Sequence, residues 1–243
     1  MKEKWISLDN KPSFAELYDQ LFPLNRETLI FLKNNLPTGN ILDIGCATGA
    51  YLLELERDGY QGKGIDLDPE MINIAKQKAK QKGLNSKFMV GDMSNFHLSM
   101  EVDGLYSIGN TLVHAVNLSV ARKVVHNFYQ ALKPGGKCLI QIINYDRIFD
   151  QQIDHLPTII RPGIFFERLY QFKEGKISFQ ARITLTETEE VISHTVDLLP
   201  IRFNEMISLL ESVGFRKIHT WSGFSKDPFN QDQSLQLVIT CQK

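Results

Sequence analysis

The stretch Ile41-Leu-Asp-Ile-Gly-Cys-Ala-Thr-Gly49 decides the fold of this chain. Its first residues read as a buried strand that runs directly into a turn containing Gly45 and Gly49. Because glycine has no Cβ and adopts positive φ readily, such a turn lets the backbone approach a ligand closely. Asp43 stands at the end of the strand, where its carboxylate can face the crevice of a parallel sheet. The stretch predicts a strand, a glycine turn and a helix that together bind a nucleoside.

The next two strands deliver acids to the same edge of the sheet. Residues 62–68 read as a strand that ends in Asp66, about 20 residues after the turn, where an acid binds ribose hydroxyls in dinucleotide-binding folds. The alternative role for Asp66 is a second capping residue at the start of the next helix. Residues 86–93 read as a third strand that ends in Asp92. We therefore expect Asp43, Asp66 and Asp92 to converge on one crevice.

The rest of the pattern gives the fold class. Residues 102–114 read as a central fourth strand, 118–132 as an amphipathic helix stopped by the Lys-Pro-Gly-Gly sequence at 133–136, and 137–144 as a buried fifth strand. A helix over 203–214 and an antiparallel strand pair, 215–221 and 235–240, complete the core. We predict an α/β fold with a doubly wound, seven-stranded, mostly parallel sheet whose last strand is antiparallel.

An insertion separates the fifth strand from the last helix. Residues 146–162 contain two prolines and read as a loop, and 164–172, 177–186 and 190–199 read as three antiparallel strands. In the middle strand apolar and polar residues alternate, so one face must pack on the core. We expect four segments: an N-terminal helical cover (1–39), the binding core (40–145), a β-rich substrate lid (146–200) and a C-terminal completion of the core (201–243).

Composition excludes several classes of protein. The 243 residues carry 27 basic and 28 acidic side chains, a formal net charge of −1, so no overall field attracts nucleic acid or an anionic membrane. The 3 cysteines lack the Cys-x-x-Cys spacing of a zinc site, and we expect no metal. The segment Met1–Trp5 has no apolar leader and no apolar run is long enough to span a membrane, so we expect a cytoplasmic protein.

The glycine turn and the block over 118–145 resemble those of the class I S-adenosylmethionine-dependent methyltransferases. The first motif of that family is an acid followed by Gly-x-Gly-x-Gly, and here Ala47 replaces the middle glycine. A dinucleotide fingerprint would need Gly-x-Gly-x-x-Gly, and Asp43 would repel its pyrophosphate. The resemblance spans residues 40–145. It implies S-adenosylmethionine as the cofactor, with S-adenosylhomocysteine as the product.

The resemblance also implies roles for individual residues. Asp66 would bind the ribose, Leu67 would lie against the adenine, Asp92 would accept the adenine amino group, and Met93 would pack on the ring. The full predicted cofactor set is Asp43, Gly45, Ala47, Gly49, Asp66, Leu67, Met71, Asp92, Met93, Ile108, Gly109 and Asn110, with the last three beside the sulfonium.

Acceptor-binding residues are expected around the same edge. His114, after the fourth strand, is a candidate general base, and a histidine held by a loop partner is the alternative. Tyr18 lies in a Tyr-Asp stretch like the one that folds over the cofactor in small-molecule methyltransferases, although it can equally be a packing aromatic. Asn144 and Tyr145 would line the pocket by topology.

The expected lid also carries charged candidates. Arg168, with Arg161 and Arg182, could form a carboxylate-binding fork, or simply be solvated.

These observations predict transfer of a methyl group to an N or O atom of a small-molecule acceptor. An RNA or protein methyltransferase would need an open, positively charged face beside the cofactor, and a catalytically silent nucleoside-binding module would need only the cofactor site. A nucleotide-dependent oxidoreductase is disfavoured by Asp43 and the incomplete glycine pattern. We expect no membrane partner, and either a monomer or a homodimer.

Overall fold

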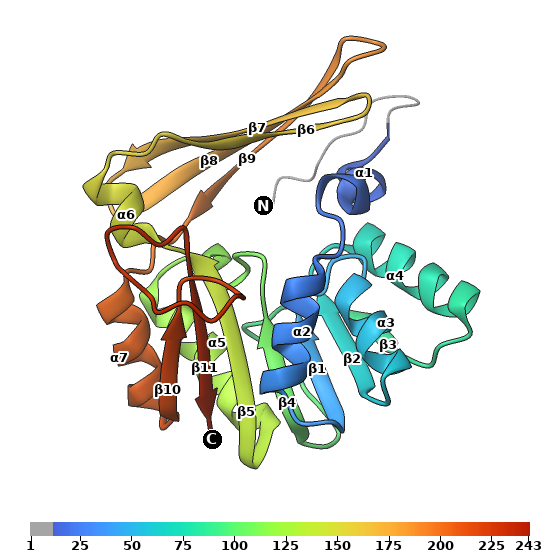
Figure 1. Ribbon diagram of the computed structural model, residues 1–243, viewed down its shortest axis with the longest axis vertical. Helices are drawn as coiled ribbons and strands as arrows, with labels where there is room; N and C mark the ends of the chain where they lie inside the picture. The colour runs from blue at the N-terminus through green and yellow to red at the C-terminus, as the bar shows by residue number, and fades with distance from the viewer. Residues whose placement is uncertain (1–11) are drawn as a thin grey trace.

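Two β-sheets organise the chain, a large one and a smaller one that lies across its top (Figure 1). The computed structural model describes residues 12–243, so the start of the expected N-terminal cover and the absence of an apolar leader lie outside the described residues. The large sheet is seven-stranded, in the order β10-β11-β5-β4-β1-β2-β3. Its strands are β1 (Asn40–Ile44), β2 (Gln61–Asp66), β3 (Lys87–Val90), β4 (Val102–Ser107), β5 (Leu132–Ile143), β10 (Arg216–Trp221) and β11 (Gln236–Gln242).

The predicted fold class is confirmed. The pairs β1–β2, β1–β4, β2–β3 and β4–β5 are parallel, whereas the last strand, β11, runs antiparallel to β5 and to β10. The strand order reverses between β1 and β4. In an open α/β sheet, ligands bind at such a switch point, outside the carboxyl ends of the strands.

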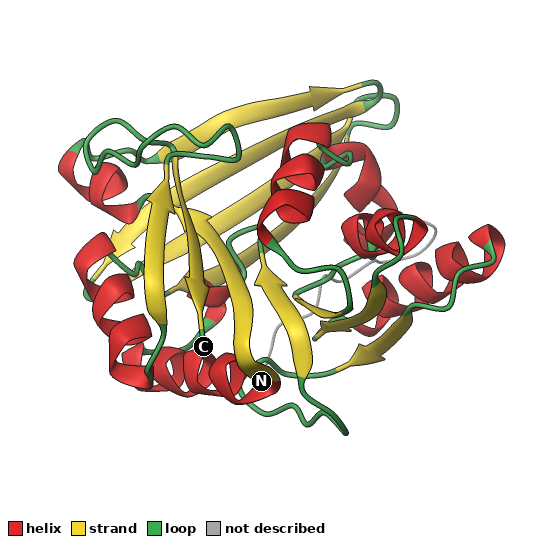
Figure 2. Ribbon diagram, turned by 60° about the horizontal axis from the view of Figure 1, so that its bottom comes forward, coloured by secondary structure: helices red, strands yellow, loops and turns green. Residues whose placement is uncertain are grey.

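Helices cover both faces of the large sheet (Figures 1 and 2). On one face α2 (Arg26–Asn35), α3 (Ala50–Arg57) and α4 (Pro69–Lys82) bury apolar side chains such as Leu32, Leu53 and Ala75. On the other face α5 (Leu118–Ala131) and α7 (Phe203–Val213) do the same. Residues 91–101, which connect β3 to β4, form no helix. Among the described helices, none is long and apolar enough to cross a membrane.

The upper sheet corrects the expected insertion. It has four antiparallel strands instead of three: β6 (His155–Arg161), β7 (Ile164–Lys173), β8 (Lys176–Leu185) and β9 (Glu190–Leu198). Residues 146–162 are therefore not a loop, since they hold most of α6 (Tyr145–Asp150) and all of β6. A loop was predicted because of Pro157, but an edge strand such as β6 tolerates proline. The β6–β7 register shifts between Leu156 and Ile159, on either side of this proline.

The upper sheet packs on the rest of the molecule in two places, against α1 and against the main core. Its inner face is built of cross-strand rows, Phe166–Ile183–Ile192, then Arg168–Ala181–His194, then Tyr170–Phe179–Val196. The first row packs against Leu17 and Leu21 of α1 (Phe14–Leu21). Tyr170, with Phe179 and Val196 partly buried beside it, belongs to the main core. The middle row therefore lies between the contact with α1 and the contact with the main core.

Candidate active site

The glycine turn lies at the switch point, where the sequence predicts it. Asp43 ends up 3% exposed near the carboxyl end of β1, directly beside Tyr106 of β4 in register. Gly45 has φ 76° and Gly49 has φ 75°, both in the left-handed region that favours glycine. A Cβ on Gly45 would collide with the side chain of Thr111, in the loop after β4. The turn is thus packed against both strands that flank the switch point.

Ala47, which replaces the family's middle glycine, also has a left-handed backbone, with φ 45°. Its amide donates a hydrogen bond to Oδ2 of Asp66 at 2.9 Å. The same carboxylate accepts the amide of Asp68 through Oδ1, also at 2.9 Å. Asp66 therefore ties the turn to the end of β2, and each of its oxygens retains a lone pair for a ribose hydroxyl.

Replacing Ala47 by glycine should stabilise the protein. A left-handed alanine costs about 1–2 kcal/mol, and the greater flexibility of glycine in the unfolded chain offsets about half of that. We expect the free energy of unfolding, measured in urea, to rise by ~0.5–1 kcal/mol. As a control, Ala79→Gly in the interior of α4 should lower it by about 1 kcal/mol. Equal losses in both variants would contradict the strain assigned to Ala47.

Three titratable groups meet beside the turn. Burial raises the pKa of Asp43 to about 8; the phenol of Tyr106 opposes this shift and the negative charge of Asp66 adds to it. Burial also raises the pKa of Asp66, against the pull of the amides of Asp68 and Ala47. The phenol of Tyr18 has a raised pKa, because of burial and then because Asp66 and Asp43 lie nearby. Such a site favours a ligand that brings a cation or hydroxyl donors.

The predicted adenine side lies next to Asp66. Leu67 is 47% exposed at the end of β2, an apolar surface open to a flat ring. Met71 is buried with Ala47 and Ala15 beneath α1, so it shapes the site from below. Asp68 caps α4 by accepting the amides of Glu70 and Met71.

The segment after β3 borders this side as well. The amide of Gly91 bonds to the carbonyl of Asp66 at 2.8 Å, which sets Asp92 next to the end of β2. Asp92 also accepts the amide of Ser94 at 2.8 Å. Met93 is partly buried against the main core.

The loop after β4 forms the opposite side. Gly109, with φ 77°, donates its amide to Gln141 Oε1 at 2.6 Å, and Ile108 packs with the core beside β1. Asn110, with φ 66°, accepts the amide of Ile143 at 2.9 Å and donates to the hydroxyl of Tyr145 at 3.0 Å. These contacts fix the loop near the place where the resemblance puts the sulfonium.

Two predicted pocket residues take internal positions. Asn144 is 2% exposed; its amide donates to the carbonyls of Gln231 (2.7 Å) and Ser234 (2.9 Å), and its oxygen caps α6. Tyr145 is buried, and burial and the nearby Tyr170 phenol raise its pKa. The prediction that Asn144 lines the pocket is therefore wrong, because its amide bonds to the connection between β10 and β11. Tyr145 contacts the site through its hydroxyl, which accepts a hydrogen bond from Asn110.

The other acceptor candidates are spread over the upper sheet and the segment after β4. His114 ends the short 3-10 helix η1 (Leu112–His114) and is exposed. Of the three lid arginines, only Arg168 lies in the middle row of the inner face. Arg161 instead donates to the carbonyls of Gln20 and Leu21 at the end of α1, and Arg182 lies on the outer face near Glu167. The expected three-arginine fork is therefore wrong.

Several residues near the site were not predicted from the sequence. Asp19, Thr48 and Lys78 form one hydrogen-bonded group that connects α1, the turn and α4. Thr48 lies inside the glycine turn, but Lys78 belongs to no recognisable motif, so only the fold brings the two together. His194 was also missed, although its register with the apolar Ile192 and Val196 signals an inward position. Among residues 12–243, no group of three or more His, Cys, Asp or Glu side chains could hold a metal ion.

A mostly parallel sheet of this order, with a glycine turn and buried acids at its switch point, defines a nucleoside-binding α/β domain. Its glycine cradle, the acids Asp43 and Asp66 and the apolar Leu67 fit the cationic, ribose and adenine parts of S-adenosylmethionine. Residues 41–136 match the methyltransferase domain family.

Curated relatives extend this likeness over most of the chain. A glycine/sarcosine N-methyltransferase of Aphanothece halophytica is 24% identical over 227 residues, which cover 90% of this chain and 84% of the relative. A carboxy-S-adenosyl-L-methionine synthase of Nautilia profundicola is 24% identical over 237 residues, covering 92% and 93%. The family match and these relatives support a class I S-adenosylmethionine-dependent methyltransferase.

Solved structures share the fold. An S-adenosylmethionine-dependent methyltransferase from Clostridium acetobutylicum superposes with a TM-score of 0.81 at 18% identity, over 94% of this chain and 97% of that one. An amino pentose methyltransferase from Micromonospora echinaspora, solved with S-adenosylmethionine bound, gives a TM-score of 0.72 at 15% identity, over 98% and 100%. The similarity therefore covers the upper sheet as well as the core.

Proposed function

We propose that this methyltransferase acts on an N or O atom of a small acceptor that carries an anionic group, with a small amine as the first candidate. The observation that carries the proposal is the position of Arg168, a cation on the otherwise largely apolar inner face of the upper sheet. The donor would bind below it, at the glycine turn.

Arg168 is poorly satisfied by the protein. One of its terminal nitrogens, Nη2, donates to the carbonyl of Pro157 at 2.7 Å, and the guanidinium lies 5.8 Å from the ring centre of Phe166. Its Nε is buried without a hydrogen-bond partner, and no carboxylate lies within ion-pair distance among the described residues. Burial lowers the pKa of Arg168. A partly desolvated guanidinium with unused donors favours a carboxylate or another planar anion.

The placement of Arg168 fits a role in orienting the acceptor. It lies between Phe166, which packs with α1, and Tyr170, which packs with the main core. His194 shares its cross-strand row. An anionic group held there would leave the rest of a small acceptor directed toward the carboxyl edge of the large sheet. The relatives named as glycine/sarcosine N-methyltransferases support an amine that carries a carboxylate.

The donor side needs few protein groups. S-adenosylmethionine supplies an activated methyl group for in-line displacement, so the chain contributes position and removal of water. Asp43 and Asp66 would hold the cationic and ribose parts, and Asn110 would fix the loop beside the sulfonium. His114, in the segment after β4, remains the proposed base for an acceptor that arrives protonated, and Tyr18 would close the site from α1.

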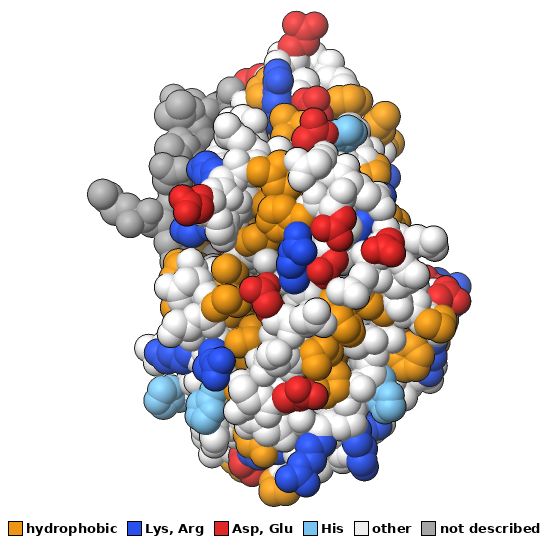
Figure 3. All heavy atoms as spheres, turned by 90° about the vertical axis from the view of Figure 1, so that its left-hand side faces the viewer, with side chains coloured by type: hydrophobic (Ala, Val, Ile, Leu, Met, Phe, Trp, Pro, Cys, Tyr) orange, Lys and Arg blue, Asp and Glu red, His pale blue; other side chains and the backbone are white. Residues whose placement is uncertain are grey.

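One face of the molecule and the net charge favour a small acceptor over a nucleic acid. On the face in Figure 3, basic, acidic and apolar side chains are interspersed, without a continuous basic stripe. A nucleic-acid substrate would require many phosphate contacts from lysine and arginine. The formal net charge of −1 adds to this argument.

The experiment is a turnover assay with S-adenosylmethionine and a panel of small acceptors. Glycine, sarcosine and other amino acids would be compared with matched amines that lack the carboxylate, and methylated product and S-adenosylhomocysteine would be followed by mass spectrometry. We expect turnover only with anionic acceptors. Equal turnover of the uncharged amines would contradict the role of Arg168, and a mass increase on the donor itself would favour the activity for which the carboxy-S-adenosyl-L-methionine synthases are named.

A further inference from the structure

We propose that Asp19 is a positioning residue that couples the donor site to the upper sheet through α1. The inference rests on the proposed function, because it assumes that the donor lies at the glycine turn and the acceptor beneath the upper sheet. The coupling between the two sites acts through one short helix, α1.

α1 lies directly against the glycine turn. Ala15 of this helix forms a small buried group with Ala47 and Met71, and Tyr18 packs on that group. The helix starts at a capping box in which Ser13 and Glu16 bond each other's amides, as their spacing predicts. Its position therefore decides where the phenol of Tyr18 lies relative to Asp43 and Asp66.

Asp19 fastens this helix to two other elements. Its Oδ1 accepts the hydroxyl of Thr48 at 2.5 Å, and its Oδ2 accepts Nζ of Lys78 at 2.7 Å. Lys78 also donates to Thr48 at 3.1 Å, which closes a triangle between α1, the glycine turn and α4. Thr48 is 1% exposed and the Asp19 side chain is 47% exposed, so only the Thr48 end of this bond is shielded from water. Charge-assisted bonds of this kind are about twice as strong as neutral ones.

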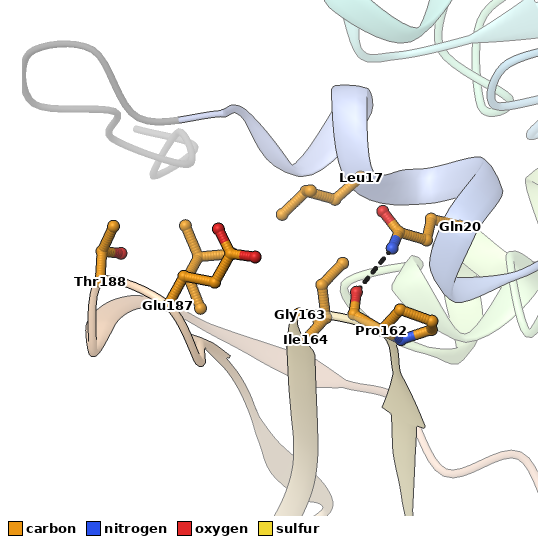
Figure 4. A pocket seen from close by; sticks show the side chains of 8 residues that line it. Leu17, Gln20, Pro162, Gly163, Ile164, Glu187 and Thr188 are labelled. Atoms are coloured by element: carbon orange, nitrogen blue, oxygen red, sulfur yellow. Dashed lines mark hydrogen bonds between the residues drawn. The ribbon is translucent and has the colours of Figure 1, made fainter.

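The far side of α1 is fastened to the upper sheet. Arg161 donates to the carbonyl of Gln20 at 3.1 Å and to that of Leu21 at 3.5 Å, at the end of the helix where a cation is favourable. The side chain of Gln20 donates to the carbonyl of Pro162 at 2.9 Å, as Figure 4 shows.

Packing at this contact is incomplete. Beside these bonds, the described residues of α1 and of the β6–β7 and β8–β9 turns border a hollow of ≈ 270 Å³. A few polar contacts, together with the apolar row around Phe166, therefore hold the upper sheet to α1. A change at the glycine turn is transmitted through Asp19 to α1, and from there to the end of the upper sheet nearest to it.

The test uses the full chain and two readouts that need no acceptor. S-adenosylhomocysteine affinity would be measured by calorimetry, and amide hydrogen exchange over residues 14–21 and 160–166 would be measured with and without that ligand. For Asp19→Asn we expect affinity to fall about tenfold, the loss of one charge-assisted bond, and the ligand no longer to slow exchange at 160–166. Asp19→Glu should restore part of both effects. Lys78→Gln, on α4, should reproduce them in weaker form.

The matched control is Asp58→Asn, which removes an exposed ion pair with Lys33 far from the turn and should change neither readout. Wild-type affinity together with ligand-protected exchange at 160–166 in Asp19→Asn would overturn the proposal. If the wild-type chain does not bind S-adenosylhomocysteine, the proposed function fails instead. In that case faster exchange at 160–166 in the unliganded Asp19→Asn variant still supports the coupling, and unchanged exchange refutes it.

Discussion

Asp43→Asn should weaken the binding of S-adenosylhomocysteine by about 100-fold, or ~3 kcal/mol, while the protein stays folded. Asp43 is a buried acid at the switch point, and the amide keeps its size but cannot carry the negative charge that the α-ammonium group of the ligand needs. Calorimetry on the two proteins measures the effect. Asp103→Asn is the control, since this acid lies on β4 at the opposite end of the sheet, bonded to Asn40 and Lys133.

The same substitution has a defined pH dependence. Because burial raises the pKa of Asp43 to about 8, the carboxyl is largely protonated at neutral pH, and the α-ammonium group of the ligand must displace that proton. Wild-type affinity should therefore rise with pH up to about 8, by at most about tenfold per pH unit, and the affinity of Asp43→Asn should stay flat. A flat wild-type profile would contradict a titrating Asp43 at the donor site.

The free energy of unfolding of the wild type should fall as the pH rises, whereas its affinity for the ligand should increase. A raised pKa in the folded state contributes stability that is fully present below the unfolded pKa of 3.8 and is lost as pH rises through about 8. Asp43→Asn lacks this loss. We expect the variant and the wild type to unfold similarly at about pH 4, and the variant to become increasingly more stable than the wild type as the pH rises to about 9.

Arg168→Met should raise the acceptor KM about 100-fold, or ~3 kcal/mol, with little effect on donor affinity. Methionine keeps the apolar contact with Phe166 and removes the donors that would bind the anionic group of the acceptor. Steady-state kinetics on the best acceptor of the panel measures the change. Arg168→Lys should recover only part of the loss, because an ammonium cannot form a planar two-point contact.

Arg182→Met provides the matched control for this prediction. Arg182 lies on the neighbouring strand of the same sheet, but on the outer face, with its side chain 50% exposed near Glu167. It should leave the acceptor KM unchanged. An equal rise in KM in both variants would show that Arg168 acts only through general electrostatics, and unchanged kinetics in Arg168→Met would remove it from the acceptor site.

The donor half of the site was predictable because its signals are local. A parallel strand that ends in an acid and a glycine turn places its side chains at the carboxyl edge whatever the rest of the chain does, and Asp43, Asp66 and Gly45 follow that rule. The conformation of Ala47 is the informative exception. The turn imposes a left-handed backbone even where the sequence provides no glycine.

The acceptor half was less predictable because it depends on how distant elements pack. Pro157 suggested a loop, but its strand lies at an edge where the missing amide hydrogen is tolerated. Asn144 was placed at the correct end of β5, yet its side chain turns to the carbonyls of Gln231 and Ser234. Arg168 did carry a signal, since it alternates in register with Phe166 and Tyr170 and must share their inward face.

The most direct test of the central claim is a pair of calorimetric titrations on the full chain near pH 8, one with S-adenosylhomocysteine and one with NAD. A glycine turn flanked by Asp43 and Asp66 predicts saturable one-site binding of S-adenosylhomocysteine, and no binding of NAD because its pyrophosphate meets the acids. Binding of NAD without binding of S-adenosylhomocysteine at high micromolar concentration would contradict the account.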